Sequence, residues 1–184
     1  MVNVLVGIIG VLLFIALALA GAAYLGPRFT QAMVNSKAMS VTQMTSQITS
    51  ALTMRRGDEG VPIVARTQLM TLVPSGYLKA LPQNPFMGEG GYPFRVLYSG
   101  DVESSLYYAD VVFGSLGHGE EMMQVCRTIN RQGKAASDEI PQMAIEDGTN
   151  IASMIKGSSG CFQVHSDGIY GEANPGDYVV YSKI

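Results

Sequence analysis

The most constraining feature of this chain is an N-terminal stretch without charge. From Met1 to Pro27 there is no Asp, Glu, Lys or Arg, and the run from Val4 to Leu25 is apolar apart from small residues and one tyrosine. As a helix, at about 1.5 Å per residue, this run covers roughly 33 Å, slightly more than the ~30 Å hydrocarbon core of a bilayer. Because a helix in a soluble core is rarely apolar on every side, the stretch predicts a helix that spans a membrane or is surrounded by other helices.

Small residues make up much of this predicted helix. They let another helix approach closely, which matters in lipid because lipid offers no hydrophobic drive for helices to associate. We therefore expect the segment to pack against other helices, and the alternative is a lone anchor in lipid. The small residues are Gly7, Gly10, Ala16, Ala18, Ala20, Gly21, Ala22 and Ala23.

A secretory signal peptide is a second alternative, since residues 18–20 and 20–22 resemble small-x-small cleavage sites. Signal peptides begin with Lys or Arg, however, and nothing basic precedes Arg28, so the positive-inside rule has nothing to act on at this end. A basic leader removed on the cytoplasmic side would explain this pattern. The C-terminal domain would then lie across the membrane, where cysteines oxidise.

A second helical segment follows a predicted interruption. Gly26 and Pro27 weaken the helical hydrogen-bond ladder, because proline lacks an amide donor, so we expect a kink or a melted turn there. From Phe29 to Met54 apolar residues recur at helical spacings, which predicts an amphipathic helix. Its predicted buried face comprises Val34, Val41, Met44, Ile48 and either Ala51 or Leu52.

The opposite face of this second helix is polar but nearly uncharged. Lys37 is the only charged residue between Arg28 and Arg55, and the other polar positions are mostly hydroxyls and amides. Helices that face water usually carry Glu and Lys, whereas a hydroxyl can find a partner among neighbouring helices without the cost of desolvating a charge. We expect this face to be half buried among neighbours, and the alternative is a Ser/Thr-rich surface helix.

Beyond Arg55 the pattern changes to that of an α+β domain. The charged, glycine-closed run from Arg55 to Gly60 ends the long helix, and glycine and proline then mark loops. Glu120 and Glu121 open another amphipathic helix, which carries Cys126 on its buried face. The other predicted elements are strands at 94–99 and 106–113 around a hairpin turn at 100–104, a break at 114–119, a helix at 145–155, and strands at 161–165 and 178–184.

The two cysteines of the chain are Cys126 and Cys161. A bond between them would tie the helix to the sheet, and the chain-entropy description gives about 3.8 kcal/mol for closing a loop of roughly 35 residues. The alternative is two unrelated buried thiols, since free cysteine is commonly buried. Thiol labelling of the native protein with and without reductant distinguishes the two.

Composition and motifs exclude several functions. The formal charge of -3 leaves no basic excess to neutralise phosphates, so nucleic acid is not an expected partner. His118 and His165 lack the spacing of a metal-binding motif, and no nucleophile or phosphate-binding motif is complete. We therefore expect no catalytic site, no metal and no cofactor, and we do not expect an enzyme.

In their order along the chain, these features resemble the type IV pilins, and most closely the type IVb class, which includes thin-pilus pilins of conjugative plasmids. Residues 4–25 match the hydrophobic assembly helix and residues 29–54 its amphipathic half. Asn84-Pro85-Phe86, within residues 73–91, matches the loop before the sheet, and Cys126 to Cys161 matches the disulfide-bounded region. The resemblance covers nearly the whole chain. It divides the chain into an assembly helix (1–27), an amphipathic helix (28–56) and an antiparallel-sheet head (57–184) with the disulfide-bounded region at 126–161.

The resemblance implies an α+β pilin fold with one disulfide, and it also implies a sequence of maturation and assembly steps. A pilin precursor is cleaved by a prepilin peptidase at the bacterial inner membrane, and its new first residue, here Met1, is N-methylated. Inner-membrane assembly machinery then polymerises identical subunits into an extracellular helical filament. The expected partners are therefore other copies of the chain, that machinery, the peptidase and, before assembly, the membrane. The expected helix-packing residues are Asn3, Leu5, Gly7, Gly10 and Gly21.

One departure from the family pattern concerns Leu5. The family normally has Glu there, where its carboxylate meets the terminal amine of a neighbouring subunit, and this chain has no acidic residue before Asp58. Asn3 is the only polar side chain near enough to substitute. The departure leaves open a major pilin, used for adhesion, cell aggregation or conjugative mating contact, and a minor pilin or type II secretion pseudopilin. A membrane-anchored periplasmic accessory protein is the remaining alternative.

Overall fold

The computed structural model describes residues 2–60, 68–86, 94–99, 108–133, 139–143, 157–165 and 173–184. Two compact units make up the chain, Met1–Ser36 and Lys37–Ile184, which we call the N-terminal unit and the head unit. Met1, the hairpin turn expected at 100–104 and the helix expected at 145–155 lie outside the described residues.

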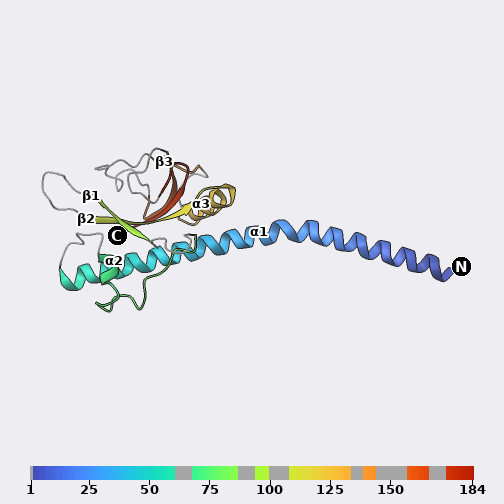
Figure 1. The fold of residues 1–184 in the computed structure, drawn as a ribbon, viewed down its shortest axis with the longest axis horizontal. Coiled ribbons are helices and arrows are strands. Elements are labelled where there is room, and N and C mark those ends of the chain that lie inside the picture. The colour runs from blue at the N-terminus through green and yellow to red at the C-terminus, as the bar shows by residue number, and fades with distance from the viewer. Residues whose placement is uncertain are drawn as a thin grey trace. The chain divides into compact units, whose positions relative to one another are not determined.

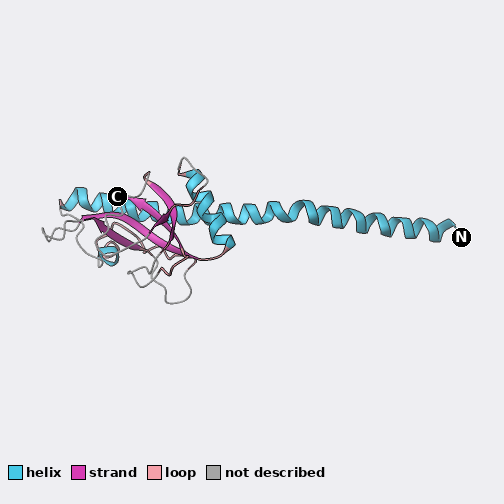
Figure 2. Ribbon diagram, turned by 90° about the horizontal axis from the view of Figure 1, so that it is seen from above, coloured by secondary structure: helices cyan, strands magenta, loops and turns pink. Residues whose placement is uncertain are grey.

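The first element is a helix of 58 residues, α1 (Val2–Glu59), which contains Pro27 in its interior. The melted turn expected at Gly26 and Pro27 is therefore wrong, and α1 is drawn as one continuous ribbon (Figure 2). Proline removes one backbone donor and crowds one carbonyl, that of Ala23. The helix can absorb this local loss because its other backbone hydrogen bonds continue on both sides. A kink at this point stays a prediction.

The part of α1 that belongs to the head unit buries one face. Val41, Ile48 and Leu52 are fully buried, which confirms the predicted apolar face. Met44 was expected on that face but is only half-buried, and Thr45 is buried beside it. Thr45 tolerates burial because its hydroxyl donates to two carbonyl oxygens of the preceding turn, at 3.1 and 2.9 Å.

The described strands form a sheet in the order β1-β2-β5-β4-β3. Neighbouring strands are antiparallel except β3 and β4, which are parallel. Together with α1 and the disulfide described below, this sheet confirms the α+β class. The strands are β1 (Arg95–Ser99), β2 (Tyr108–Gly117), β3 (Gln142–Met143), β4 (Ser159–Val164) and β5 (Tyr178–Lys183).

Strand β2 continues into the break expected at 114–119 and ends at Gly117, so the break itself is confined to residues 118 and 119. Gly114 lies inside the strand, at a position where a Cβ atom would come within 2.7 Å of the ring of Phe94. The glycine therefore allows an aromatic side chain to lie against the strand, and it does not end the strand. The strand ends at Gly117, whose positive φ of 82° follows a register shift between Ser115 and Gly117.

Helices cover one face of the sheet and an apolar cluster forms on the other. Helix α3 (Glu120–Gln132) packs against β4 and β5, and the head part of α1 runs along the sheet (Figure 1). A short helix, α2 (Gln68–Thr71), is held to α1 by a hydrogen bond from Arg55 to Thr71. Alternation along β4 turns Phe162 away from α3. The cluster on that side comprises Val111, Phe113, Met143, Phe162, Val164, Ala173, Val179 and Tyr181.

Candidate functional site

The apolar segment, residues 6–25 of α1, is exposed on all sides within this chain. Its large hydrophobic side chains keep between 48% and 73% of their surface exposed, so the described residues leave all of them uncovered. Among the described residues, α1 is the helix long and apolar enough to cross a membrane. A signal sequence has the same length and composition, but the absence of burial argues against a soluble core helix.

Three glycines of the apolar segment share one side of α1. At ~100° per residue, Gly7, Gly10 and Gly21 fall within about 60° of the helix circumference, and we call them the glycine stripe. Apart from the adjoining residues and the backbone of the helix itself, a Cβ atom at any of the three would meet no atom within 4 Å. The chain's own packing therefore gives no reason for glycine at these positions. A neighbouring helix, approaching closely from outside the chain, would supply one.

The end of the apolar segment is marked by the first charge of the chain. The Arg28 guanidinium lies 5.0 Å from the ring centroid of Tyr24, one helical turn earlier. Tyrosine and arginine with this spacing are typical of the boundary between hydrocarbon and water, where an aromatic ring and a charged head both find suitable surroundings. Asn3 and Leu5 lie within α1, but their side chains are outside the described part, so the structure does not test their expected assembly role.

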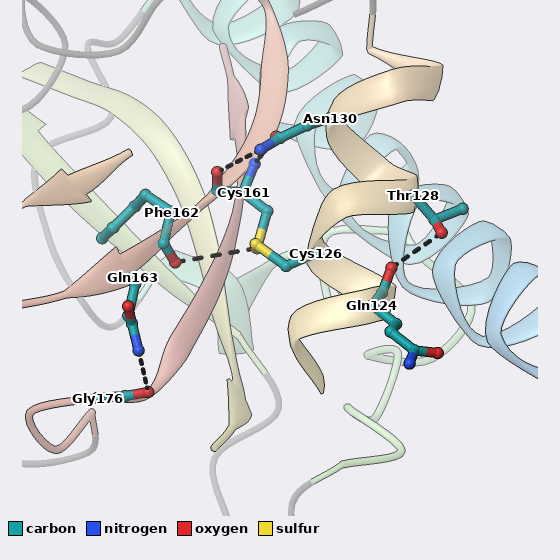
Figure 3. The surroundings of a disulfide bond; sticks show 8 residues. All are labelled: Gln124, Cys126, Thr128, Asn130, Cys161, Phe162, Gln163 and Gly176. Carbon is teal, nitrogen blue, oxygen red and sulfur yellow. Dashed lines mark hydrogen bonds between the residues drawn. A yellow bond between two sulfur atoms is a disulfide. The ribbon is translucent and has the colours of Figure 1, made fainter. Parts of the chain in front are cut away.

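Cys126 and Cys161 form a disulfide that joins α3 to β4, with Cα atoms 5.3 Å apart (Figure 3). This confirms the bond that the resemblance implied. Both residues are fully buried, and 35 positions separate them in sequence. The bond therefore closes a long loop from inside the core of the head.

A second tie between α3 and β4 lies beside the disulfide and was missed from the sequence. The Asn130 side chain accepts the backbone N–H of Cys161 at 2.7 Å and donates to its carbonyl at 3.0 Å (Figure 3). The amide thus completes both backbone hydrogen bonds of a buried strand residue, as a neighbouring strand would. Helical spacing places Asn130 on the buried face of Cys126, one turn later, but the backbone groups to which its amide bonds could not be predicted from the sequence.

The Asn-Pro-Phe loop is confirmed as a loop and docks on the head. The buried Asn84 amide donates to the carbonyl of Ser115 on β2, and its side-chain oxygen accepts the N–H of Phe86 at 3.1 Å. Lys37 of α1 lies 5.9 Å from the Phe86 ring centroid and forms an ion pair with Glu121 of α3. The single charge on this part of the polar helix face therefore joins α1, the loop and α3.

The two histidines have different surroundings. His118 is largely exposed and its Nδ1 lies 3.2 Å from a carboxylate oxygen of the buried Asp177. The other oxygen of Asp177 accepts the N–H of Asn174 at 2.8 Å. His165 is exposed just after β4. Within the described ranges, no three His, Cys, Asp or Glu side chains come together as a metal site would require.

A long apolar N-terminal helix, a sheet packed on the second part of that helix and a disulfide within the head are now in place. The architecture is pilin-like. Comparison of the chain with protein families, with curated proteins and with solved structures finds no match. The pilin-like assignment therefore rests on the order of the elements, the exposed apolar segment and the disulfide.

Proposed function

We propose that this chain is a structural subunit that polymerises through the apolar segment of α1 into an extracellular filament of the type IV pilus kind. The observation that carries the proposal is the exposure of residues 6–25 on every side of α1. Apolar surface of this extent must be covered by lipid or by other helices, because each Å² left in water costs roughly 25 cal/mol. The membrane covers it before assembly, and the same segment of neighbouring copies covers it afterwards.

The glycine stripe supports burial among helices over permanent residence in lipid. A lipid-facing helix has no need of residues that admit a close neighbour, whereas helix–helix contacts in apolar surroundings depend on them. The polar face of α1 in the head unit points the same way. Gln43, Ser46 and Gln47 are exposed and uncharged, so a neighbouring subunit can cover them without burying a charge.

The disulfide suits the head unit to the periplasmic side of the inner membrane or to the cell surface. A buried disulfide forms and persists in oxidising compartments such as the periplasm and the cell surface. The proposal therefore includes a prepilin peptidase that exposes Met1, N-methylation of that residue, and inner-membrane machinery that extracts the subunit. Adhesion, aggregation or mating contact would be the use of the finished filament.

Leu5 favours a second candidate, a minor pilin or a pseudopilin of type II secretion. The usual docking between a Glu carboxylate and a terminal amine has no counterpart at this position, and subunits of those two kinds also occur without the carboxylate. The absence of the charge removes a costly group from the hydrocarbon. The two candidates differ in the abundance and the place of the filament, and both use the apolar segment for assembly.

The test compares surface filaments from cells that produce the wild-type chain or stripe variants. We expect sheared extracellular fibres to contain the wild-type chain, and Gly7→Leu with Gly10→Leu to reduce fibre yield severalfold while the subunit accumulates in the inner membrane. Ala16→Leu is the control, because at ~100° per residue it lies roughly opposite the stripe and introduces the same leucine side chain there. Equal yields from stripe and control variants would contradict close packing at the stripe, and fibres that lack the chain would contradict the proposal.

A further inference from the structure

A cleft of about 400 Å³ opens in the head unit beside α3 and lies outside everything used for assembly above. Its walls come from α3, from residues 139 and 140 before β3, and from β4 and β5. A cleft of this volume is at the lower end of small-ligand sites and has room for one sugar ring or one side chain. The residues that decide its chemistry are Met123, Arg127, Arg131, Glu139, Ile140 and Tyr178.

Two arginines give the cleft a positive wall. Arg127 and Arg131 are four residues apart and so lie on the same side of α3. Arg127 is exposed, and no hydrogen bond or ion pair joins it to any residue in the described part of the chain. Glu139 contributes one carboxylate on another wall. The three formal charges leave the cleft with one net positive charge in a chain whose overall charge is -3.

Two polar side chains from the sheet also line the cleft, and hydrogen bonds hold one of them in position. Gln163 of β4 also lines it, and its amide donates to the carbonyl of Gly176 at 3.1 Å and accepts from Gln142 at 3.4 Å. Tyr178 of β5 is 7% exposed, and among the described residues none forms a hydrogen bond with its hydroxyl. In the described part of the chain, Thr49 Oγ1 is the buried side-chain atom that lacks a partner, so the Tyr178 hydroxyl still reaches solvent, where a ligand can bond to it.

We propose that this cleft binds a single carboxylate-bearing sugar residue. The guanidinium of Arg127 matches a carboxylate through two parallel N–H···O bonds, and Arg131 adds charge beside it. Glu139, the Gln163 amide and the Tyr178 hydroxyl offer the acceptors and donors that ring hydroxyls need. Met123 and Ile140 provide apolar surface for the C–H face of the ring.

The presence of both arginines and a glutamate in the cleft favours an acidic sugar over an acidic peptide as the ligand. An acidic peptide would bring several carboxylates and one of them would approach Glu139, where like charges repel. A uronic or sialic acid brings one carboxylate for Arg127 and several hydroxyls, which can bond to acceptor positions that remain on Glu139 beside its existing interaction within the chain. The inference does not depend on polymerisation, since all of these residues belong to the head unit.

The test measures binding to the full-length chain in a detergent without a sugar headgroup. Galacturonic acid and N-acetylneuraminic acid are the probes, neutral galactose and a Glu-Glu dipeptide are the comparisons, and saturation-transfer NMR with calorimetry gives the dissociation constants. We expect both acids to bind in the millimolar range, at least about tenfold more tightly than galactose or the dipeptide. Binding should also weaken as salt is raised, because the arginines are exposed to solvent.

Variants locate the site. Arg127→Ala should weaken binding of the acids at least about tenfold, since it removes a charge-assisted bidentate contact, and Tyr178→Phe should weaken it severalfold while keeping the ring. Arg56→Ala is the control, because Arg56 is an exposed helical arginine far from the cleft in sequence. Equal affinity for galactose and galacturonic acid, tighter binding of the dipeptide, or unchanged binding by Arg127→Ala with an unchanged thermal midpoint would each overturn the inference.

Discussion

Asn130 carries more of the head's stability than an asparagine in a helix usually does. Its side chain is 3% exposed and both of its polar atoms bond to the backbone of Cys161. We predict that Asn130→Ala lowers the free energy of unfolding by about 3 kcal/mol, because it leaves a buried N–H and a buried carbonyl without partners. Chemical denaturation of the oxidised full-length chain in detergent, followed by circular dichroism, measures the change.

Two further variants make the Asn130 prediction specific. Asn130→Asp keeps the acceptor for the N–H of Cys161 but sets a carboxylate against its carbonyl, so it should destabilise the head at least as much as alanine. Gln132→Ala, at an exposed position of the same helix, should change the free energy of unfolding by less than about 0.5 kcal/mol. If Asn130→Ala has the same free energy of unfolding as the wild type, water or neighbouring groups replace the amide and the prediction is wrong.

At the residue scale, the sequence predicted the covalent tie and missed the polar one. Two cysteines in one chain indicate a candidate disulfide by their number and their usual burial. Asn130 and Thr45, in contrast, are buried only because specific carbonyls lie within reach of their side chains. Nothing in a polar residue's type announces such a partner before the chain is folded. Gly114 was misinterpreted for a related reason, since the Phe94 ring that requires it is distant in sequence.

At the scale of elements, the disulfide staples α3 to the sheet. We predict that Cys126→Ala with Cys161→Ala lowers the free energy of unfolding by about 3.8 kcal/mol, the chain-entropy value for a closed loop of this length. Denaturant unfolding of the variant, beside oxidised and reduced wild-type chains, measures the loss. Because both sulfurs are buried, reductant should act on the native protein only slowly and on the unfolded protein at once. Coincident unfolding curves for the oxidised and variant chains would contradict the prediction.

Helices and strands were predictable where their periodicity was long and regular. The apolar face of α1 around Val41 and Ile48, the helix α3 and the strand β5 follow from spacing alone. The elements differ from expectation where a single glycine or proline was given more weight than the pattern around it. Pro27 interrupts one hydrogen bond of a helix that continues on both sides, so it did not end α1. Glycine and proline therefore predicted boundaries less well than hydrophobic periodicity predicted elements.

At the scale of the whole chain, the boundary between Ser36 and Lys37 separates surface that needs lipid or other copies from a unit with its own core. We predict that residues 37–184 fold in water without detergent, as a monomer with the disulfide formed, because Val41, Ile48 and Leu52 of α1 remain to cover the sheet. The full-length chain should require detergent or form filaments, since its apolar segment remains exposed. Size-exclusion chromatography with light scattering and circular dichroism measures both properties.

A shorter fragment tests why that boundary matters. Residues 57–184 lack the head part of α1 and so expose the sheet face that Ile48 and Leu52 cover, at roughly 25 cal/mol per Å² of apolar surface. This fragment should aggregate or lose its cooperative unfolding transition, although it keeps both cysteines. If it is as soluble and as stable as residues 37–184, the second part of α1 is dispensable to the head. If residues 37–184 themselves need detergent, the head exposes apolar surface of its own, and filament assembly cannot be assigned to the apolar segment alone.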